Sequence, residues 1–283
     1  MTETSESAPA AWLPLTPRGV AAFASASLGR LFLVQLVAGL LVCGGIIALA
    51  GKNFSPIISD ATRSLPDKAM LANGELKGLE PGILANGTLL AIVADPERTE
   101  KFGQTADFQI EFGRTSVEIS GLLGSREIDY PLETTLTLDR AKVEPWWGAW
   151  RPMIVAGFGL SFLPLLFLSW ILLATIYFLP VKLCAFFADR ALSSGGAWRL
   201  SGAALVPGAL LMAAAIFLYG WHVIDLVRFG AIFVLHLVVG WVYLLFSPWT
   251  LPKIAAARKS STNPFASASE EKESPEPRTD GVA

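Results

Sequence analysis

The sequence predicts a membrane protein, built as an all-α bundle of four transmembrane helices with a small extracytoplasmic α+β module inserted after the first helix. Three observations predict this class. Charged residues are absent from four long stretches, the segment between the first two stretches alternates apolar and polar residues, and lysine and arginine gather at one end of the stretches. The composition agrees, since 53% of the residues are hydrophobic and the mean hydropathy is +0.51. These values argue against a purely soluble fold.

The four uncharged stretches cover residues 31–51, 152–181, 200–224 and 229–252. A bilayer core about 30 Å thick needs about 20 apolar residues of helix, so each stretch is long enough to span it. Helices are expected because backbone polar groups in lipid must pair with one another. Helices buried in a soluble core are the alternative, but a chain of this length could not supply such a core four times.

The N-terminal part of the chain divides at Thr16. Residues 1–15 are polar and contain prolines, and we expect them to be disordered. Thr16 followed by Pro17 is typical of a helix start, so residues 16–51 are predicted as a helix that runs into the first span. The tripeptide ALA at 48–50 could be a cleavage site, but the long apolar run favours a retained anchor.

Residues 52–151 are predicted to form the inserted module. Ser55 and Pro56 signal the start of a short amphipathic helix, with Ile57, Ile58, Ala61 and Leu65 on one face. The Asn-Gly pairs at 73–74 and 86–87 each lie between short apolar runs, which is the strongest local signal for a β-hairpin. Two hairpins are therefore expected directly after this helix.

Further strands are predicted from a period of two in apolar residues. They cover residues 107–112, 116–120, 126–132 and 135–138. Pro131 marks an edge strand, because proline cannot donate to a central ladder. One apolar and one polar face is typical of an antiparallel sheet that faces water on one side. The module is thus expected to be β-rich and antiparallel.

Residues 152–252 are predicted to form the other three transmembrane helices, followed by a disordered tail over residues 253–283, which is rich in Ser, Pro and Glu. Tryptophans near the ends of the spans are expected to anchor the protein at the membrane interfaces. They are Trp146, Trp147, Trp150, Trp221 and Trp249.

Basic residues near the span ends predict the orientation. Eight lie on the side of the N-terminus: Arg18, Arg30, Lys182, Arg190, Arg199, Lys253, Arg258 and Lys259. The short loop at 225–228, on the other side, contains only Arg228. Cytoplasmic loops carry an excess of Lys and Arg, so both termini are expected in the cytoplasm and residues 52–151 outside.

The inserted module contains few residues of the types that catalyse reactions or bind metals. It contains no histidine and no cysteine, which excludes a zinc cluster and a histidine-assisted nucleophile within it. Its carboxylates alternate along the strands as expected of water-exposed faces. We therefore predict no catalytic residues, no metal and no cofactor, and we expect that the chain is not an enzyme. Nucleic acid is not an expected partner.

Polar residues inside the predicted spans are candidate functional positions. The two histidines, His222 and His236, could face each other near the outer surface. The simpler alternative is that His222 is interfacial and His236 donates to a neighbouring helix. Gln35 is expected to join two helices by a hydrogen bond. Glycines and prolines in the second and third spans either line a transport site or allow close packing.

The run LPDKAMLANGELKGLEPGILANGTLLAIVADP at 65–96 is similar to the "LP…NGEL…P…IIDT" run of a family of bacterial multi-span membrane proteins. That family contains a domain of unknown function and is distantly Yip-like. The layout of one span, an outer module and a cluster of spans also resembles it. The chain departs at 94–96, where the family tends to have Asp followed by Thr. The resemblance implies a bacterial inner membrane and brings no catalytic residue.

We expect an accessory, sensor or assembly factor that lies in the lipid bilayer. It would dock a membrane or periplasmic protein partner, or a second copy, through its module. One alternative is a subunit of an oligomeric transporter or channel, which predicts that His236 or the Gly and Pro positions face a water-filled cavity. Another is a membrane enzyme acting on lipid or envelope precursors, which predicts carboxylates converging in one cleft.

Overall fold

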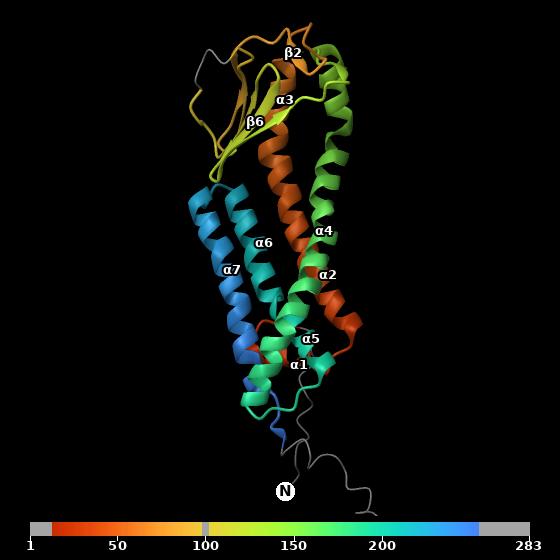
Figure 1. The fold of residues 1–283 in the computed structure, drawn as a ribbon, viewed down its shortest axis with the longest axis vertical. Helices are drawn as coiled ribbons and strands as arrows, with labels where there is room; N and C mark the ends of the chain where they lie inside the picture. The colour runs from red at the N-terminus through yellow and green to blue at the C-terminus, as the bar shows by residue number, and fades with distance from the viewer. Residues whose placement is uncertain (1–12, 98–101, 255–283) are drawn as a thin grey trace, which may run out of the picture.

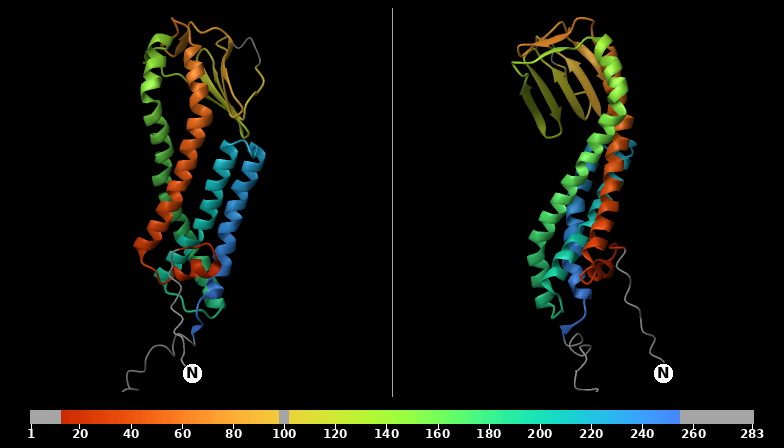
Figure 2. Two further views of the ribbon diagram at one scale, coloured as in Figure 1. Left: turned by 180° about the vertical axis from the view of Figure 1, so that it is seen from behind. Right: turned by 90° about the vertical axis from the view of Figure 1, so that its right-hand side faces the viewer.

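The computed structural model describes residues 13–97 and 102–254. Long helices run side by side and carry a β module at one end, and α1 lies at the other end (Figures 1 and 2). The helices are α1 (Pro17–Ala22), α2 (Leu28–Leu49), the π-helical turn η1 (Ala50–Phe54), α3 (Ser55–Arg63), α4 (Arg140–Phe187), α5 (Ser194–Ala204), α6 (Val206–Gly220), α7 (Leu226–Phe246) and η2 (Ser247–Thr250).

Among the described residues, four helical segments are long and apolar enough to cross a membrane. They are Leu28–Arg63, Arg140–Phe187, Ser194–Gly220 and Leu226–Thr250. The prediction of four apolar helices with an inserted β module is therefore confirmed.

The first helix starts where the sequence predicts, but it ends earlier than predicted. The Oγ1 atom of Thr16 accepts a hydrogen bond of 3.0 Å from the backbone N–H of Gly19, as expected of a helix cap. This helix, α1, then ends after a few residues. A new cap follows, because Ser27 Oγ accepts a hydrogen bond from the backbone of Arg30 at 3.3 Å. The predicted single helix over 16–51 is therefore wrong, and the segment forms α1 and α2.

The helix α2 continues through η1 into α3 without a break. In η1 the N–H of Ser55 bonds to the carbonyl of Ala50, five residues earlier, which is the π-helical pattern. The short helix predicted to start at Ser55 is confirmed as α3, but it is not separated from the first span, because η1 joins it to α2. Pro56 is tolerated here because a proline fits the first turn of α3.

The helix α4 is much longer than its predicted span at 152–181. It has 48 residues, which corresponds to about 72 Å at 1.5 Å per residue. Asp139 caps its start, since its side chain accepts a hydrogen bond from the backbone of Lys142 at 2.8 Å. The β module therefore ends at Asp139 rather than at residue 151. Four prolines lie inside the helix: Pro145, Pro152, Pro164 and Pro180.

The β module contains a three-stranded sheet in the order β2-β1-β8 and a five-stranded sheet in the order β3-β4-β5-β6-β7. The strands are β1 (Met70–Ala72), β2 (Glu75–Lys77), β3 (Gly82–Asn86), β4 (Leu90–Ala94), β5 (Phe108–Phe112), β6 (Ser116–Gly121), β7 (Gly124–Asp129) and β8 (Thr135–Thr137). Both predicted hairpins are confirmed. In the first, Asn73 and Gly74 have φ of 50° and 72°, as a tight type I′ turn requires.

The five-stranded sheet is mixed rather than antiparallel. Strands β4 and β5 pair in parallel, with Leu90 opposite Phe108 and Ala94 opposite Phe112. The other neighbouring pairs are antiparallel. The prediction of a wholly antiparallel module is therefore wrong. Residues 95–107 are the reason, because a connection of about a dozen residues lets the chain return before the next strand begins.

The end of the bundle away from the β module has its own apolar core. Side chains that are fully buried there include Val20, Phe23, Leu31, Val181, Leu200 and Leu244. Basic side chains form hydrogen bonds between segments at this end. Arg199 Nη2 donates to the carbonyl of Ala24 at 2.7 Å, and Lys182 Nζ donates to the carbonyl of Leu192 at 3.1 Å. The predicted disordered tails fall mostly in residues 1–12 and 255–283, outside the described residues.

Candidate functional site: an apolar cavity in the β module

The amphipathic helix predicted after the first span forms one wall of the site. Ala61 of α3 is buried, and Ile57 and Ile58 pack with it against Ala85 and Ile92 of the five-stranded sheet. The apolar face expected from the helical spacing is thus the face that covers the sheet. This packing leaves a space between α3 and the module.

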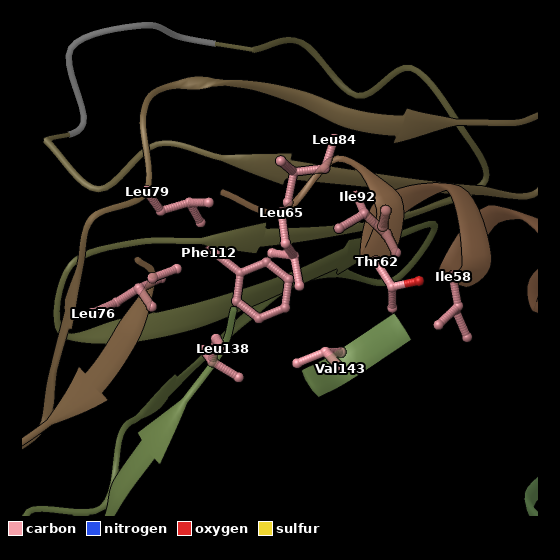
Figure 3. A pocket seen from close by; sticks show the side chains of 12 residues that line it. Ile58, Thr62, Leu65, Leu76, Leu79, Leu84, Ile92, Phe112, Leu138 and Val143 are labelled. Carbon is pink, nitrogen blue, oxygen red and sulfur yellow. The ribbon is translucent and has the colours of Figure 1, made fainter. Parts of the chain in front are cut away.

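That space is an apolar cavity of about 200 Å³ (Figure 3). It is lined by α3, by both sheets and their loops, and by the first turn of α4. The lining residues are Ile58, Ala61, Thr62, Leu65, Ala69, Leu76, Leu79, Leu84, Ile92, Phe112, Leu138 and Val143. The cavity therefore forms only where α3, α4 and the two sheets meet.

The side chains of the cavity wall are not suited to binding a polar ligand. Thr62 supplies the only polar side chain among the described lining residues, and its hydroxyl already donates to the carbonyl of Ser59 at 2.8 Å. A cavity of about 150 Å³ lined by Leu, Ile and Phe stays dry and binds small apolar molecules such as benzene. A cavity of this size and lining is therefore suited to an apolar group.

A buried tryptophan holds the two helices of the wall together. Trp147 of α4 is buried, and its Nε1 donates to Ser59 Oγ of α3 at 2.9 Å. Ser59 Oγ in turn donates to the carbonyl of Ser55 at 2.9 Å. A buried indole N–H usually needs such a partner. Trp147 was predicted as an interfacial anchor, but its side chain is buried between α3 and α4.

The other four tryptophans predicted as interfacial anchors are exposed. They are Trp146, Trp150, Trp221 and Trp249. Trp221 follows the last residue of α6, and Trp249 lies in η2 at the opposite end of the bundle. Large aromatic side chains exposed near both ends of apolar helices are typical of membrane interfaces.

A half-buried aromatic side chain lies beside the five-stranded sheet. Tyr130, just after β7, donates from its hydroxyl to the carbonyl of Gly113 at 3.2 Å. Burial raises the pKa of Tyr130 to about 12, because the charged phenolate loses its hydration there. The side chain therefore stays neutral and joins the turn before β6 to the end of β7.

Two hydrogen bonds connect the β module and η1 to the end of α6. Tyr219 is buried at the end of α6 and donates from its hydroxyl to the Asp107 carboxylate at 2.7 Å. Asn53 of η1 donates to the carbonyl of Gly220 at 3.0 Å. The ring of Tyr219 also stacks on Phe229 of α7, with 5.0 Å between centroids. No local sequence pattern indicated these contacts.

The three polar residues predicted inside the spans have different positions. Gln35 is buried in α2, and its Nε2 donates to the carbonyl of Gly202 in α5 at 3.2 Å. His222 is exposed in the turn after α6 with φ of 58°. His236 lies ten residues into α7 and its Nδ1 contacts the carbonyl of Phe233. Ten residues correspond to about 15 Å of helix, so the structure gives the two histidines different levels.

The Gly and Pro positions of the third span lie at helix contacts. Pro207 and Gly208 are buried in α6. A Cβ atom on Gly208 would lie only 2.7 Å from the carbonyl oxygen of His236. Gly208 therefore allows the backbones of α6 and α7 to approach closely, as small residues do between membrane helices.

Several acidic side chains form scattered surface pairs. Glu144 contacts Arg63 at 3.3 Å and Arg140 at 3.1 Å, and Glu75 contacts Lys77 at 3.3 Å. Within residues 13–97 and 102–254, no group of three His, Cys, Asp or Glu side chains could hold a metal ion. Cys43 and Cys184 are free thiols.

Comparison of the chain with protein-family models, with curated proteins and with solved structures found no match. The resemblance to the family of bacterial multi-span proteins therefore stays a prediction.

Proposed function

We propose that this chain is an accessory or sensor protein of a bacterial inner membrane, and that its β module binds a single lipid acyl chain in the cavity behind α3. The observation that carries the proposal is the lining, where apolar side chains of two sheets and two helices surround a partly open space of about 200 Å³. An acyl chain has no polar group to satisfy, so such a wall can bind it without an unpaired donor or acceptor.

The connection of the cavity to the bundle supports a membrane-derived ligand. Two of its walls, α3 and α4, belong to helices that continue into the apolar bundle. Ile58 lies five residues beyond Asn53, which corresponds to about 8 Å of helix. An acyl chain in the adjacent leaflet would therefore need to move only a short distance to reach the cavity.

The arrangement of basic side chains supports the proposed orientation. Lys182 and Arg199 contact backbone carbonyls at the end of the bundle away from the β module. Cytoplasmic ends of membrane helices are rich in such residues. In the proposed orientation both termini are cytoplasmic, and the β module lies outside.

The transport and enzyme alternatives draw less support. Gly208 packs against the backbone of His236, whereas a transport site would use such a position to face water. Glu75 and Glu144 lie in surface ion pairs, and the described cavity lining contains no carboxylate. An interaction role therefore fits these observations best.

The test is photolabelling of the full-length protein in nanodiscs with a fatty acid that carries a diazirine near its methyl end. We expect cross-links to peptides that contain residues 58–65 and 76–84. Leu79 lines the cavity, so Leu79→Trp should fill it and reduce labelling of these peptides to background. Leu132→Trp is the matched control, because Leu132 is an exposed loop leucine outside the lining.

Two results would overturn the proposal. One is labelling confined to the exposed faces of α4 and α7. The other is labelling of residues 58–65 and 76–84 that persists equally in both tryptophan variants. A circular dichroism spectrum of Leu79→Trp that matches the wild type would show that the variant is folded.

A further inference from the structure

The turn between β6 and β7 exposes two adjacent leucines. Leu122 is 59% exposed and Leu123 is fully exposed, at 101%. Gly121 pairs with Gly124 across the hairpin, and Gly124 has φ of 104°. A tight hairpin tip normally carries polar turn residues, so nothing in the fold of this turn requires two leucines.

The tip lies at the end of the sheet that meets the bundle. A Cβ atom on Gly121 would lie 3.3 Å from the ring of Phe108 and 3.5 Å from the carbonyl oxygen of Asp107. The carboxylate of the same Asp107 accepts the hydrogen bond from Tyr219 at the end of α6. The contacts therefore run from α6 through the start of β5 to the tip. Figures 1 and 2 show this end of the sheet above the ends of α6 and α7.

The surface next to the tip is apolar and belongs to the bundle. Trp221 and Val223 in the turn after α6, and Val227 at the start of α7, are all exposed. The exposed apolar surface continues along α7 through Phe233 and Val234. The tip thus lies beside the surface that faces lipid if the bundle spans a bilayer.

The sequence of the tip favours insertion into a lipid interface. No charged residue occurs between Glu118 and Arg126, over residues 119–125. Insertion of this segment would therefore move no charge out of water, and the exposed leucine side chains would leave water as they enter lipid. Arg126 follows directly and is long enough to reach lipid phosphate groups.

We propose that Leu122 and Leu123 insert into the interfacial region of the outer leaflet beside α6 and α7. The β module then has a second attachment to the membrane, on the side opposite to α3 and α4. The inference rests on the proposed membrane insertion of the bundle, and it is independent of a ligand in the cavity.

The experiment measures the depth of an environment-sensitive fluorophore, NBD, on the full-length protein in phosphatidylcholine nanodiscs. Cys43→Ala and Cys184→Ala first remove the native thiols, and NBD is then attached at Leu123→Cys. We expect blue-shifted emission that is quenched by 5-doxyl phosphatidylcholine and not by aqueous iodide. NBD at Arg114→Cys, in the exposed turn at the opposite end of the sheet, should show the reverse.

A third label separates failure of this proposal from failure of membrane insertion. Val234 is exposed in the middle of α7, so NBD at Val234→Cys should be quenched by doxyl lipid whenever the bundle spans the disc. Water-like emission and iodide quenching at residue 123, with normal quenching at 234, would overturn the proposal. Protection of residue 123 from both quenchers would mean that a protein covers the tip, and would overturn it as well.

A second measurement uses unlabelled protein and guards against an effect of the fluorophore. Hydrogen exchange of residues 117–128 in nanodiscs should become faster in the double variant Leu122→Ser and Leu123→Ser, while exchange in β1 and β2 stays unchanged. An equal exchange rate in the wild type and the double variant would contradict lipid contact by the tip.

Discussion

The hydroxyl of Tyr219, in the last turn of α6, donates a hydrogen bond of 2.7 Å to the carboxylate of Asp107, just before β5. Tyr219 is buried, and its ring stacks on Phe229 of α7. This hydrogen bond joins the β module to the α6–α7 pair, whereas α3 and α4 join it to the other side of the bundle. The module is therefore held at two separate places.

Replacement of Tyr219 by Phe should loosen the module on one side. Hydrogen bonds to carboxylate groups contribute about 1.5–3 kcal/mol, and the variant would remove this donor from Asp107. We expect faster hydrogen exchange in residues 104–109 and a lower midpoint of thermal unfolding in detergent. Tyr243→Phe is the matched control, because Tyr243 donates to the carbonyl of Leu15 at the other end of the bundle. Equal exchange at residues 104–109 in both variants would refute the linking role.

The close approach of α6 and α7 at Gly208 should not tolerate a methyl group. A Cβ atom there lies 2.7 Å from the backbone oxygen of His236, which no side-chain rotation can move. Gly208→Ala should therefore destabilise the protein by about 1–3 kcal/mol, the usual cost of overpacking. Gly240→Ala, on α7, meets nothing within 4 Å and should be neutral or stabilising. Thermal unfolding of both variants in the same detergent checks this, and equal midpoints would contradict it.

The pair of adjacent tryptophans at the start of α4 offers an internal comparison. Trp147 is buried and donates to Ser59, whereas Trp146 is exposed. Trp147→Phe should lower the free energy of unfolding by about 1 kcal/mol, because a hydrogen bond is lost. The loss should be larger if Ser59 repacks. Trp146→Phe should leave the unfolding midpoint unchanged within error. A larger loss of stability from the change at Trp146 would contradict the α3–α4 contact through Trp147.

Alkaline pH should destabilise the β module through Tyr130. The folded state raises the pKa of this phenol to about 12, above its unfolded value of about 10. The neutral phenol is the form that the fold favours, so its contribution is complete below pH about 10 and is lost as the pH rises to about 12. The phenolate absorbance of the wild type minus that of Tyr130→Phe should rise with a midpoint near pH 12. Titration near 10 in the folded protein would rule out the burial.

Local patterns in the sequence predict much of this fold. The pair Asn73-Gly74 specifies its own turn, since both residues adopt positive φ there. The uncharged stretches predict the long helices, because length and hydropathy decide whether a helix can span a bilayer. The parallel pairing of β4 with β5 was not predicted, because the sequence of a strand does not specify the direction of its neighbour.

The candidate site was predicted only in part. The apolar face of α3 follows from helical spacing, and Ala61 lies on it as expected. The cavity needs two sheets and two helices to meet, which no local pattern encodes. Tyr219 and Asp107 are 112 positions apart in the chain, so the residues next to either one do not predict their hydrogen bond. The same is true of Trp147 and Ser59. Their contact buries Trp147, which was predicted to anchor the protein at the membrane interface.

The pairing of β1 with β8 has a consequence for the origin and engineering of the chain. Met70 lies opposite Thr137 and Ala72 opposite Thr135, so the polypeptide enters and leaves the β module through neighbouring strands. Insertions whose two ends are adjacent disturb their host least. A helical hairpin of α3 and α4 could thus have acquired these strands as a cassette, and a short designed turn could replace them without forcing the two helices apart.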